Sequence, residues 1–235
     1  LWNDGRSSAN CAEMMAEMPS LTEITGNLAM PGFTAPKIHW MRQHEPENFR
    51  RIAKVLLPKD YVRFCLTGAF ASDMSDSAGT LWMNVERREW SEEVLALTGL
   101  TEKNMPELFE GSQPTAKLSA KIADDWGMAQ VPVAAGGGDN AAGAVGAGVV
   151  NPGEGFISLG TSGVVFLADN HYRPNTDGAV HTFCHALPGL WHQMSVILAA
   201  ASAVDFVARI AGFETESELY DQTADAKTPG KGAIF

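Results

Sequence analysis

The 235 residues are enough for one large or two small domains, and 45% hydrophobic with 19% charged residues is typical of a globular protein. A net charge of −11 argues against binding along nucleic-acid phosphates, and no apolar run reaches the ~18 residues of a membrane span. The widely spaced Cys11, Cys65 and Cys184 lack CxxC spacing and indicate reduced thiols. We therefore expect a cytoplasmic protein with no nucleic-acid or membrane partner.

Helices are predicted for most of the first half of the chain. In the first, Ser8 or Asn10 is a candidate cap, and Cys11, Met14, Met15 and Met18 recur at helical spacing. Further helices are expected at about 36–43, 46–55, 58–67 and 91–98, the last with Ser91 as its N-cap. The segment "SDMSDSAGT" is predicted to be a polar, turn-rich connector.

After Gly111 the pattern changes. A helix at about 116–126 is expected to lead into "QVPVAAGGGD", which is typical of a buried strand ending in glycines, and then into a helix of small residues. Two hairpins are predicted, one around 160–163 and one with Pro188-Gly189 at its turn, followed by an amphipathic helix that ends at Gly212. This pattern indicates a mixed α/β class with a domain boundary at "NPGEG", residues 151–155.

Asp139 has two compatible interpretations. Aspartate is a favoured N-cap and suits the positive end of a helix, so capping alone would explain it. The preceding Gly136-Gly137-Gly138 run is more than a cap needs, and it is typical of a backbone that closely approaches a substrate. A carboxylate after a strand is also where open α/β sheets bind ligands.

Two other short motifs are weaker signals. "SLGTSG", residues 158–163, offers backbone N–H groups and two hydroxyls to a phosphate, although ordinary turns have the same composition. In "WNDGR", Asp4 and Arg6 could pair and orient polar groups near a ligand, although surface pairs of this kind contribute little. The six histidines show no metal-binding spacing.

The order of the motifs resembles that of the FGGY carbohydrate kinase family. "GFTAPKIHWMRQH", residues 32–44, fits the family's first signature through Thr34, Lys37 and Trp40. "LWNDGR", "LLPKDY", "GGGDNAAGAVG" and "SLGTSG" stand in the expected order and spacing. The resemblance extends from residue 1 to about residue 212.

This resemblance implies an actin-like (ribonuclease H-like) α/β fold of two domains with an intervening cleft, and a kinase that uses ATP and Mg²⁺. It implies that Asp139 is the general base, that Asn140, Asp4 and Arg6 bind the sugar, and that Gly160, Thr161 and Ser162 bind nucleotide phosphate. The combined sequence of these motifs most resembles family members that phosphorylate D-xylulose to D-xylulose 5-phosphate. Gly32 stands where glycerol-specific relatives carry a bulky aromatic residue, which argues against glycerol.

The resemblance also implies that both domains are incomplete. Residues 1–150 correspond to the C-terminal part of the first, sugar-binding domain, and 151–235 to the N-terminal part of the second, nucleotide-binding domain. We expect this internal fragment to be inactive alone. A kinase for another ketose or polyol such as ribulose, and a non-catalytic sugar- or nucleotide-binding module, remain alternatives. The expected partners are sugar and ATP, with a homodimer as one option for assembly.

Overall fold

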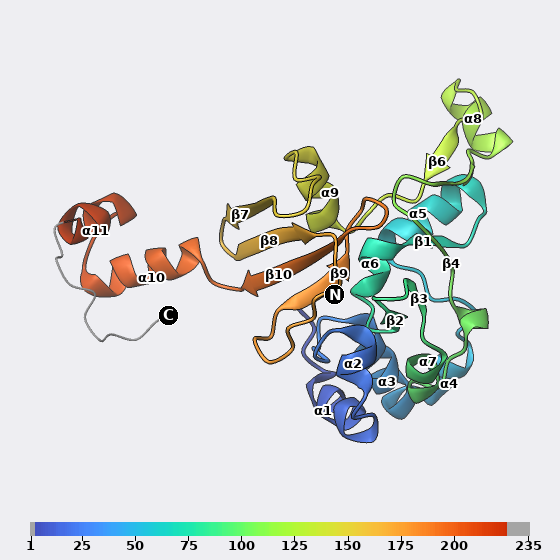
Figure 1. Ribbon diagram of the computed structural model, residues 1–235, viewed down its shortest axis with the longest axis horizontal. Helices are drawn as coiled ribbons and strands as arrows, with labels where there is room; N and C mark the ends of the chain where they lie inside the picture. Colours follow the sequence, from blue (N-terminus) through green and yellow to red (C-terminus); the bar gives the residue numbers. More distant parts are fainter. Residues whose placement is uncertain (1–2, 225–235) are drawn as a thin grey trace. The chain divides into compact units, whose positions relative to one another are not determined.

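The computed structural model describes residues 3–224 (Figure 1). Contacts between residues divide the chain into two compact units. Unit 1 contains the residues up to Gly155 together with Phe166–Met194, and unit 2 contains Phe156–Val165 together with the residues from Ser195 onward. Among the described helices, none has both the length and the apolar character that crossing a membrane would require.

Unit 1 opens with a group of short helices around an apolar core. These helices are α1 (Ser8–Glu17), α2 (Leu21–Thr25), α3 (Thr34–His44), α4 (Pro46–Arg50) and, later in the chain, α7 (Glu92–Leu97). The core they enclose includes Met14, Leu21, Leu81, Trp82 and Leu95, all fully buried. The Trp82 indole N–H donates to the Thr98 hydroxyl at 3.0 Å, so this large side chain is buried without losing its hydrogen bond.

The helical predictions in this part of the chain are largely confirmed, with two corrections. The helix expected at 46–55 ends at Arg50, and Val55 lies beyond it, donating its N–H to the Asn104 carbonyl at 2.9 Å. Ser7 occupies the N-cap position of α1, without a side-chain capping hydrogen bond, and neither Ser8 nor Asn10 takes that position. Ser91 caps α7 as predicted, accepting from the Val94 N–H.

The prediction that "SDMSDSAGT" is a turn-rich connector is wrong, because this segment forms a buried strand and a helix. The strand β1 (Ala71–Asp73) pairs in parallel with β4 (Glu107–Phe109), and α6 (Met74–Ala78) follows directly. Asp73 caps α6 by accepting from the N–H groups of Ser75 and Asp76, and this capping stabilises a helix in a polar segment. Nearby lie α5 (Pro58–Thr67), β2 (Met83–Asn84), β3 (Glu89–Trp90) and the 3₁₀ turn η1 (Glu102–Asn104).

Residues 114–134 form a small hairpin-like element with a helix between its strands. Strand β5 (Pro114–Lys117) pairs antiparallel with β6 (Pro132–Ala134), and α8 (Ala120–Trp126) lies between them in sequence. The helix therefore starts four residues later than predicted, at the Ser119 cap. The buried strand predicted before the glycines is also corrected: β6 is largely exposed, because a two-stranded sheet buries little of either strand.

A four-stranded sheet follows the helix of small residues, α9 (Asp139–Gly146). Its strands are β7 (Gly155–Leu159), β8 (Gly163–Asp169), β9 (His181–Cys184) and β10 (Trp191–Ile197), in the spatial order β7-β8-β10-β9. Both predicted hairpins are present, and β9 pairs antiparallel with β10 across the Pro188-Gly189 turn. Three imidazoles, from His181, His185 and His192, lie in an aromatic cluster within this region of unit 1.

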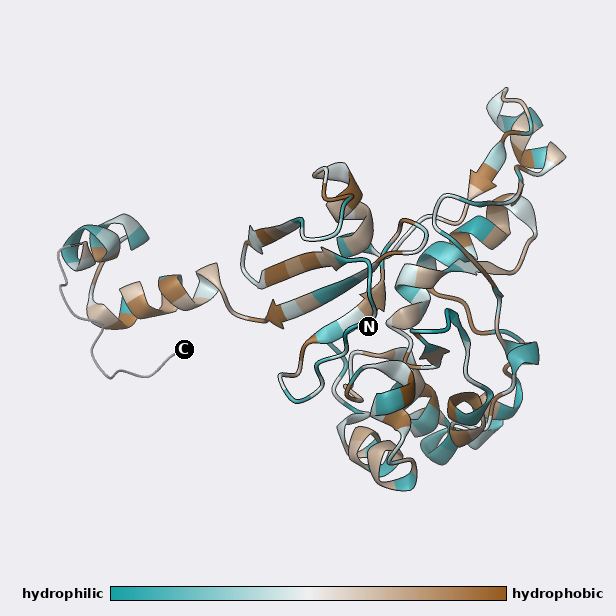
Figure 2. Ribbon diagram, viewed as in Figure 1, coloured by the Kyte–Doolittle hydropathy of each residue, from teal (hydrophilic) through white to brown (hydrophobic). Residues whose placement is uncertain are grey.

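The described part of unit 2 ends in two helices. The amphipathic helix α10 (Ala201–Ala211) ends, as predicted, at Gly212 in the left-handed conformation. It is followed by α11 (Glu216–Thr223), capped by the Thr215 hydroxyl. Hydrophobic residues colour much of β8 and one side of α10 (Figure 2).

Candidate active site

The three glycines before Asp139 each serve a different structural purpose. Gly136 has φ +83°, a conformation that residues with a side chain rarely adopt. A Cβ on Gly137 would lie 3.0 Å from the Ala186 methyl and 3.3 Å from the Ser75 hydroxyl oxygen, so this position is tightly packed. Gly138 is the N-cap residue of α9. The run therefore carries the chain through a tight turn directly onto the start of a helix.

Asp139 is the first residue of α9 and carries an exposed carboxylate. Its Oδ1 accepts from the Asn140 backbone N–H at 2.8 Å and from the Asn140 side-chain amide at 3.3 Å. Because Gly138 holds the cap position, Asp139 does not cap the helix, and the capping interpretation is corrected. Within residues 3–224, Oδ2 makes no hydrogen bond, so it is available to a ligand.

The loop that presents Asp139 is fixed at three successive points. The buried Arg63 guanidinium donates to the Ala135 carbonyl, and the Gly136 N–H donates to the Gly111 carbonyl at 2.9 Å. One residue before Asp139, the Gly138 N–H donates to the Ser75 hydroxyl at 2.9 Å. A glycine loop is costly to order, and these bonds hold it in one conformation.

Behind Ser75 lies a cluster of ion pairs that the sequence did not reveal. The Lys59 ammonium contacts Asp73 at 2.5 Å, Asp60 at 2.7 Å and Asp76 at 3.3 Å. Asp73 is fully buried, and its Oδ1 accepts the Ser75 hydroxyl at 2.5 Å. The cluster is therefore connected to the glycine loop through two side chains: Ser75, which bonds Gly138, and Arg63, which pairs with Asp60 at 3.1 Å and bonds the Ala135 carbonyl.

Protonation in this cluster follows from burial and mutual charge. Burial alone would lower the pKa of Lys59, but the three carboxylates, led by Asp73, together raise it above its ordinary value. Burial raises the pKa of Asp76, and Asp73 adds to that rise while Lys59 opposes it. Lys59 therefore remains positively charged among the carboxylates at neutral pH.

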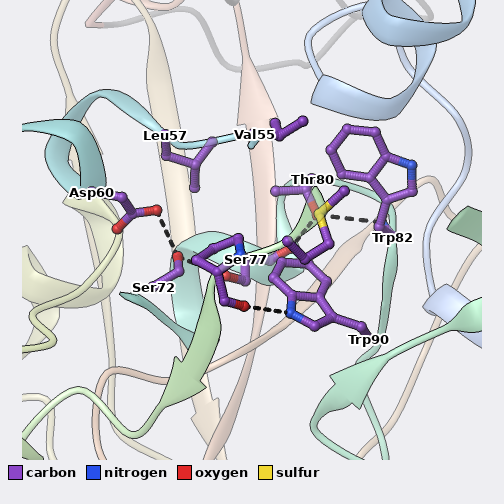
Figure 3. Close-up of a pocket in the computed structure, with 10 residues that line it drawn as sticks. Val55, Leu57, Asp60, Ser72, Ser77, Thr80, Trp82 and Trp90 are labelled. Atoms are coloured by element: carbon purple, nitrogen blue, oxygen red, sulfur yellow. Dashed lines mark hydrogen bonds between the residues drawn. The ribbon is translucent and has the colours of Figure 1, made fainter. Parts of the chain in front are cut away.

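On its other side, the cluster is joined to the core of unit 1. The second oxygen of Asp60 accepts the Ser72 hydroxyl at 2.7 Å, and Ser72 in turn accepts from Ser77 at 2.9 Å (Figure 3). A cavity of ≈ 10 Å³ lies beside these groups, walled by Trp82 and Trp90. That is about the volume of one water probe, so the cavity cannot hold a sugar.

A larger hollow of ≈ 440 Å³ is lined by residues from β3, α7 and η1. Four of its side chains are glutamates: Glu89, Glu92, Glu93 and Glu102. Like charges repel, so this hollow is a poor site for the phosphates of a nucleotide despite the presence of Arg87.

Asp4 and Arg6 form the pair that their spacing predicts. The Arg6 guanidinium donates to both carboxylate oxygens of Asp4, with the shortest contact at 2.6 Å, and lies 4.7 Å over the Trp40 ring. Hydrogen bonds from Arg6 lower the pKa of Asp4. Within the described residues, no hydrogen bond or ion pair joins this pair to Asp139 or Asn140.

The loop of residues 160–162 in unit 2 is the sharp turn between β7 and β8. The Gly160 N–H donates to the Ser162 carbonyl at 2.9 Å, so it is used within the turn. The Thr161 carbonyl accepts from the Ala200 N–H and the Ser202 hydroxyl, which ties the turn to the start of α10. In the part of the chain that the structure describes, the N–H groups of Thr161 and Ser162 make no hydrogen bond, and both residues are exposed.

Sequence reasoning singled out Asp139 and Asn140 but missed Lys59, Asp73 and Ser75. One signal was present: Asp73 is followed three residues later by a second acid, Asp76, an arrangement close to a capping box. The motif "LLPKDY" was noted, but nothing in it shows that Lys59 reaches α6, because that contact depends on tertiary packing.

Comparison with known proteins places this site in context. Residues 1–146 match the N-terminal domain of the FGGY family of carbohydrate kinases. A xylulose kinase of Escherichia coli K12 is 55% identical over 219 residues, covering 93% of this chain and 45% of that protein. One from Klebsiella pneumoniae is 50% identical over 227 residues, covering 96% and 47%. A crystal structure described as a xyloylose kinase from Brucella ovis has a TM-score of 0.90 at 54% identity, covering 94% of this chain and 46% of that one.

These matches define the class of protein: a mixed α/β chain with the actin-like fold of the sugar kinases, as the motifs predict. The chain belongs to the FGGY family of carbohydrate kinases. It spans about half the length of the curated relatives it matches.

Proposed function

We propose that this chain is part of an ATP-dependent kinase that converts D-xylulose to D-xylulose 5-phosphate. The observation that carries the proposal is an exposed Asp139 carboxylate on a fixed glycine loop, in a chain 55% identical to a xylulose kinase. The 54% identity to the Brucella ovis kinase supports the same choice of sugar. An exposed carboxylate at this loop favours an enzyme over a non-catalytic binding module, which would not need a base.

Asp139 is the general base in this proposal. Its carboxylate takes the proton from the sugar hydroxyl as the hydroxyl oxygen forms a bond to the γ-phosphorus of ATP, and the bond from that phosphorus to the bridging oxygen breaks to release ADP. The base must lie within ~2.6–3.2 Å of the hydroxyl, so the rate of proton transfer depends on where the carboxylate is held. The hydrogen bonds of the loop and its direct link to helix α9 suit that requirement because they hold the backbone immediately before Asp139.

Asn140, Asp4 and Arg6 are proposed sugar contacts. For Asn140 the support is direct adjacency, because its side-chain amide already bonds Asp139 and leaves its carbonyl oxygen for a hydroxyl. For Asp4 and Arg6 the support is the family resemblance, and in the free chain each group is engaged with the other.

Gly160, Thr161 and Ser162 are the proposed contacts to ATP phosphate. Exposed N–H groups and hydroxyls of Thr161 and Ser162 suit phosphate oxygens, since a tight turn can bind an anion without a cation. Gly160 contributes by allowing the turn. Mg²⁺ is expected with ATP, but among residues 3–224 no group of three or more Asp, Glu, His or Cys side chains is arranged to hold a metal ion.

The domain assignment is also part of the proposal. Residues 1–150 would belong to the sugar-binding domain and 151–235 to the nucleotide-binding domain of a cytoplasmic enzyme. The match of residues 1–146 to the family's N-terminal domain supports the first boundary.

The test is a substrate panel on the gene product that carries this sequence. ADP release is measured with D-xylulose, D-ribulose, L-ribulose and glycerol, and the phosphorylated product is identified by ³¹P NMR. We expect D-xylulose to give the highest kcat/KM and a 5-phosphate product. Preference for ribulose or glycerol would reassign the sugar, and sugar binding by calorimetry without ADP release would favour the binding-module alternative.

A further inference from the structure

Ser75 occupies a special place between the buried ion cluster and the glycine loop. It is 4% exposed and lies on α6, more than sixty residues from Asp139 in sequence. Its hydroxyl does two things at once: it donates to Asp73 at 2.5 Å and accepts the Gly138 N–H at 2.9 Å.

The Asp73 side of this link is rigid. Asp73 is fully buried, caps α6, and is paired with Lys59 at 2.5 Å. Because its Oδ1 accepts the Ser75 hydroxyl proton, the lone pairs of Ser75 are left to face a donor, and that donor is Gly138. The orientation of the hydroxyl is therefore set by a buried carboxylate that is itself ion-paired and hydrogen-bonded.

The Gly138 side of the link is where rigidity matters. Gly138 is the N-cap of α9, and the next residue bears the proposed catalytic carboxylate. Gly137 lies close to Ser75 as well, since a Cβ added to Gly137 would be only 3.3 Å from the Ser75 oxygen. A shift of Ser75 would thus move the backbone immediately before Asp139.

We propose that Ser75 is a positioning residue for Asp139: held by Asp73, its hydroxyl fixes the Gly138 N–H and so the point from which the Asp139 carboxylate projects. The functional part of this inference rests on the proposed kinase activity. The structural part concerns the chain alone and can be tested without turnover.

The structural arm uses amide hydrogen exchange at single residues in the 235-residue chain. Ser75→Ala removes the acceptor, and we expect exchange at Gly138 to rise about tenfold, the factor that corresponds to one ordinary hydrogen bond. Ser75→Cys keeps the side-chain volume but offers a weak acceptor, so it should act in the same direction if the alanine variant folds poorly. Ser77→Ala is the matched control: Ser77 is also buried on α6 but bonds Ser72 instead of the loop.

The functional arm uses the kinase assay on the gene product that carries this sequence. A 1 Å misplacement of a catalytic group can cost up to ~100-fold, so Ser75→Ala should lower kcat by about ten- to a hundredfold and leave the KM for ATP unchanged. In the Asp139→Asn background the same substitution should have little further effect, because two residues that act through one group are not additive.

Two results together would support the proposal. Amide exchange should become faster at Gly138 in both Ser75 variants and not in Ser77→Ala, and Ser75→Ala should not lower kcat further in the Asp139→Asn background. Unchanged amide exchange at Gly138 would overturn it. So would a double variant, Ser75→Ala with Asp139→Asn, whose loss of kcat equals the product of the two single losses. If Asp139→Asn itself left turnover unchanged, the proposed function of Asp139 would fail, whereas the exchange result would still decide whether Ser75 holds the loop.

Discussion

Single residues around the glycine loop leave little space for larger side chains. Gly111 lies against the carbonyls of Ala186 and Gly136, and a Cβ there would be 2.6 Å from the Gly136 oxygen. Asp139 could be singled out as a candidate from the sequence, because a carboxylate after three glycines is conspicuous and lies next to the residues that shape its loop. Lys59 and Asp73 could not be found in this way, since their ion pair forms only when the fold brings α5 and α6 together.

Gly111→Ala should destabilise unit 1. The added methyl has no space between two backbone carbonyls, and overpacking of this kind costs about 1–3 kcal/mol. The free energy of unfolding is measured by urea titration of the chain. Gly143→Ala is the control: Gly143 lies inside α9 with open space around it and should gain up to ~1 kcal/mol. Equal stability of the two variants would contradict the packing described.

Among the elements, the hairpin of β9 and β10 was predictable and the β1–α6 unit was not. Pro188-Gly189 between apolar strands is a strong local turn signal, and the hairpin follows from it. The segment 71–78 is polar in sequence, and it becomes strand and helix because β4 pairs with it, Asp73 caps it and Lys59 neutralises it. Those three causes are tertiary, so no local pattern predicts them.

The same hairpin places imidazoles in the core. His192 is 2% exposed and stacks on Phe166 with ring centroids 4.2 Å apart. Burial, with a smaller contribution from His185, lowers the pKa of His192 to about 3. Burial also lowers the pKa values of His181 and His185, and Arg88 adds to the effect on His185. These three rings are therefore neutral in the folded chain at neutral pH.

This predicts a stability that falls in acid. Because the unfolded His192 binds its proton near pH 6.5 and the folded one near pH 3, its contribution is complete above pH 6.5 and is lost as the pH falls toward 3. The slope from this group is about 1.4 kcal/mol per pH unit. His192→Leu should flatten the free energy of unfolding over this range, measured by urea titration at several pH values.

The control for that experiment is His171→Leu, since His171 is an exposed histidine beside Asp169. It should leave the pH dependence as in the parent chain. A His192→Leu profile parallel to the parent profile between pH 6.5 and 3 would show that the acid sensitivity has another origin.

At the scale of the whole molecule, the two units differ in how well they bury apolar side chains. Unit 1 has an extensive core, whereas unit 2 exposes Ile157, Leu159, Leu198, Phe206 and Ile210. The FGGY fold was predictable from sequence because five motifs stand in one order along the chain. The inclusion of Phe166–Met194 in unit 1 was not, because strands β8 and β10 each contribute residues to both units.

The exposed side chains of α10 should make the 235-residue chain self-associate. Phe206 and Ile210 are one turn apart on the same helix face and are 54% and 68% exposed. Replacing both with lysine should lower the association constant at least ~10-fold in analytical ultracentrifugation. Tyr61→Lys, at an exposed aromatic residue of unit 1, is the control and should change association little. If the association constant were unchanged by the double substitution, this face of α10 would be excluded as the self-association surface.

The most direct test of the central claim is the kinetics of Asp139→Asn in the gene product that carries this sequence. The amide keeps the size of the side chain but cannot accept the hydroxyl proton, so kcat for D-xylulose should fall by about 10²–10⁴. Asp124→Asn, at an exposed aspartate on α8, should leave kcat unchanged. Asp139→Asn turnover within a few-fold of the parent would contradict the assignment of Asp139 as the general base.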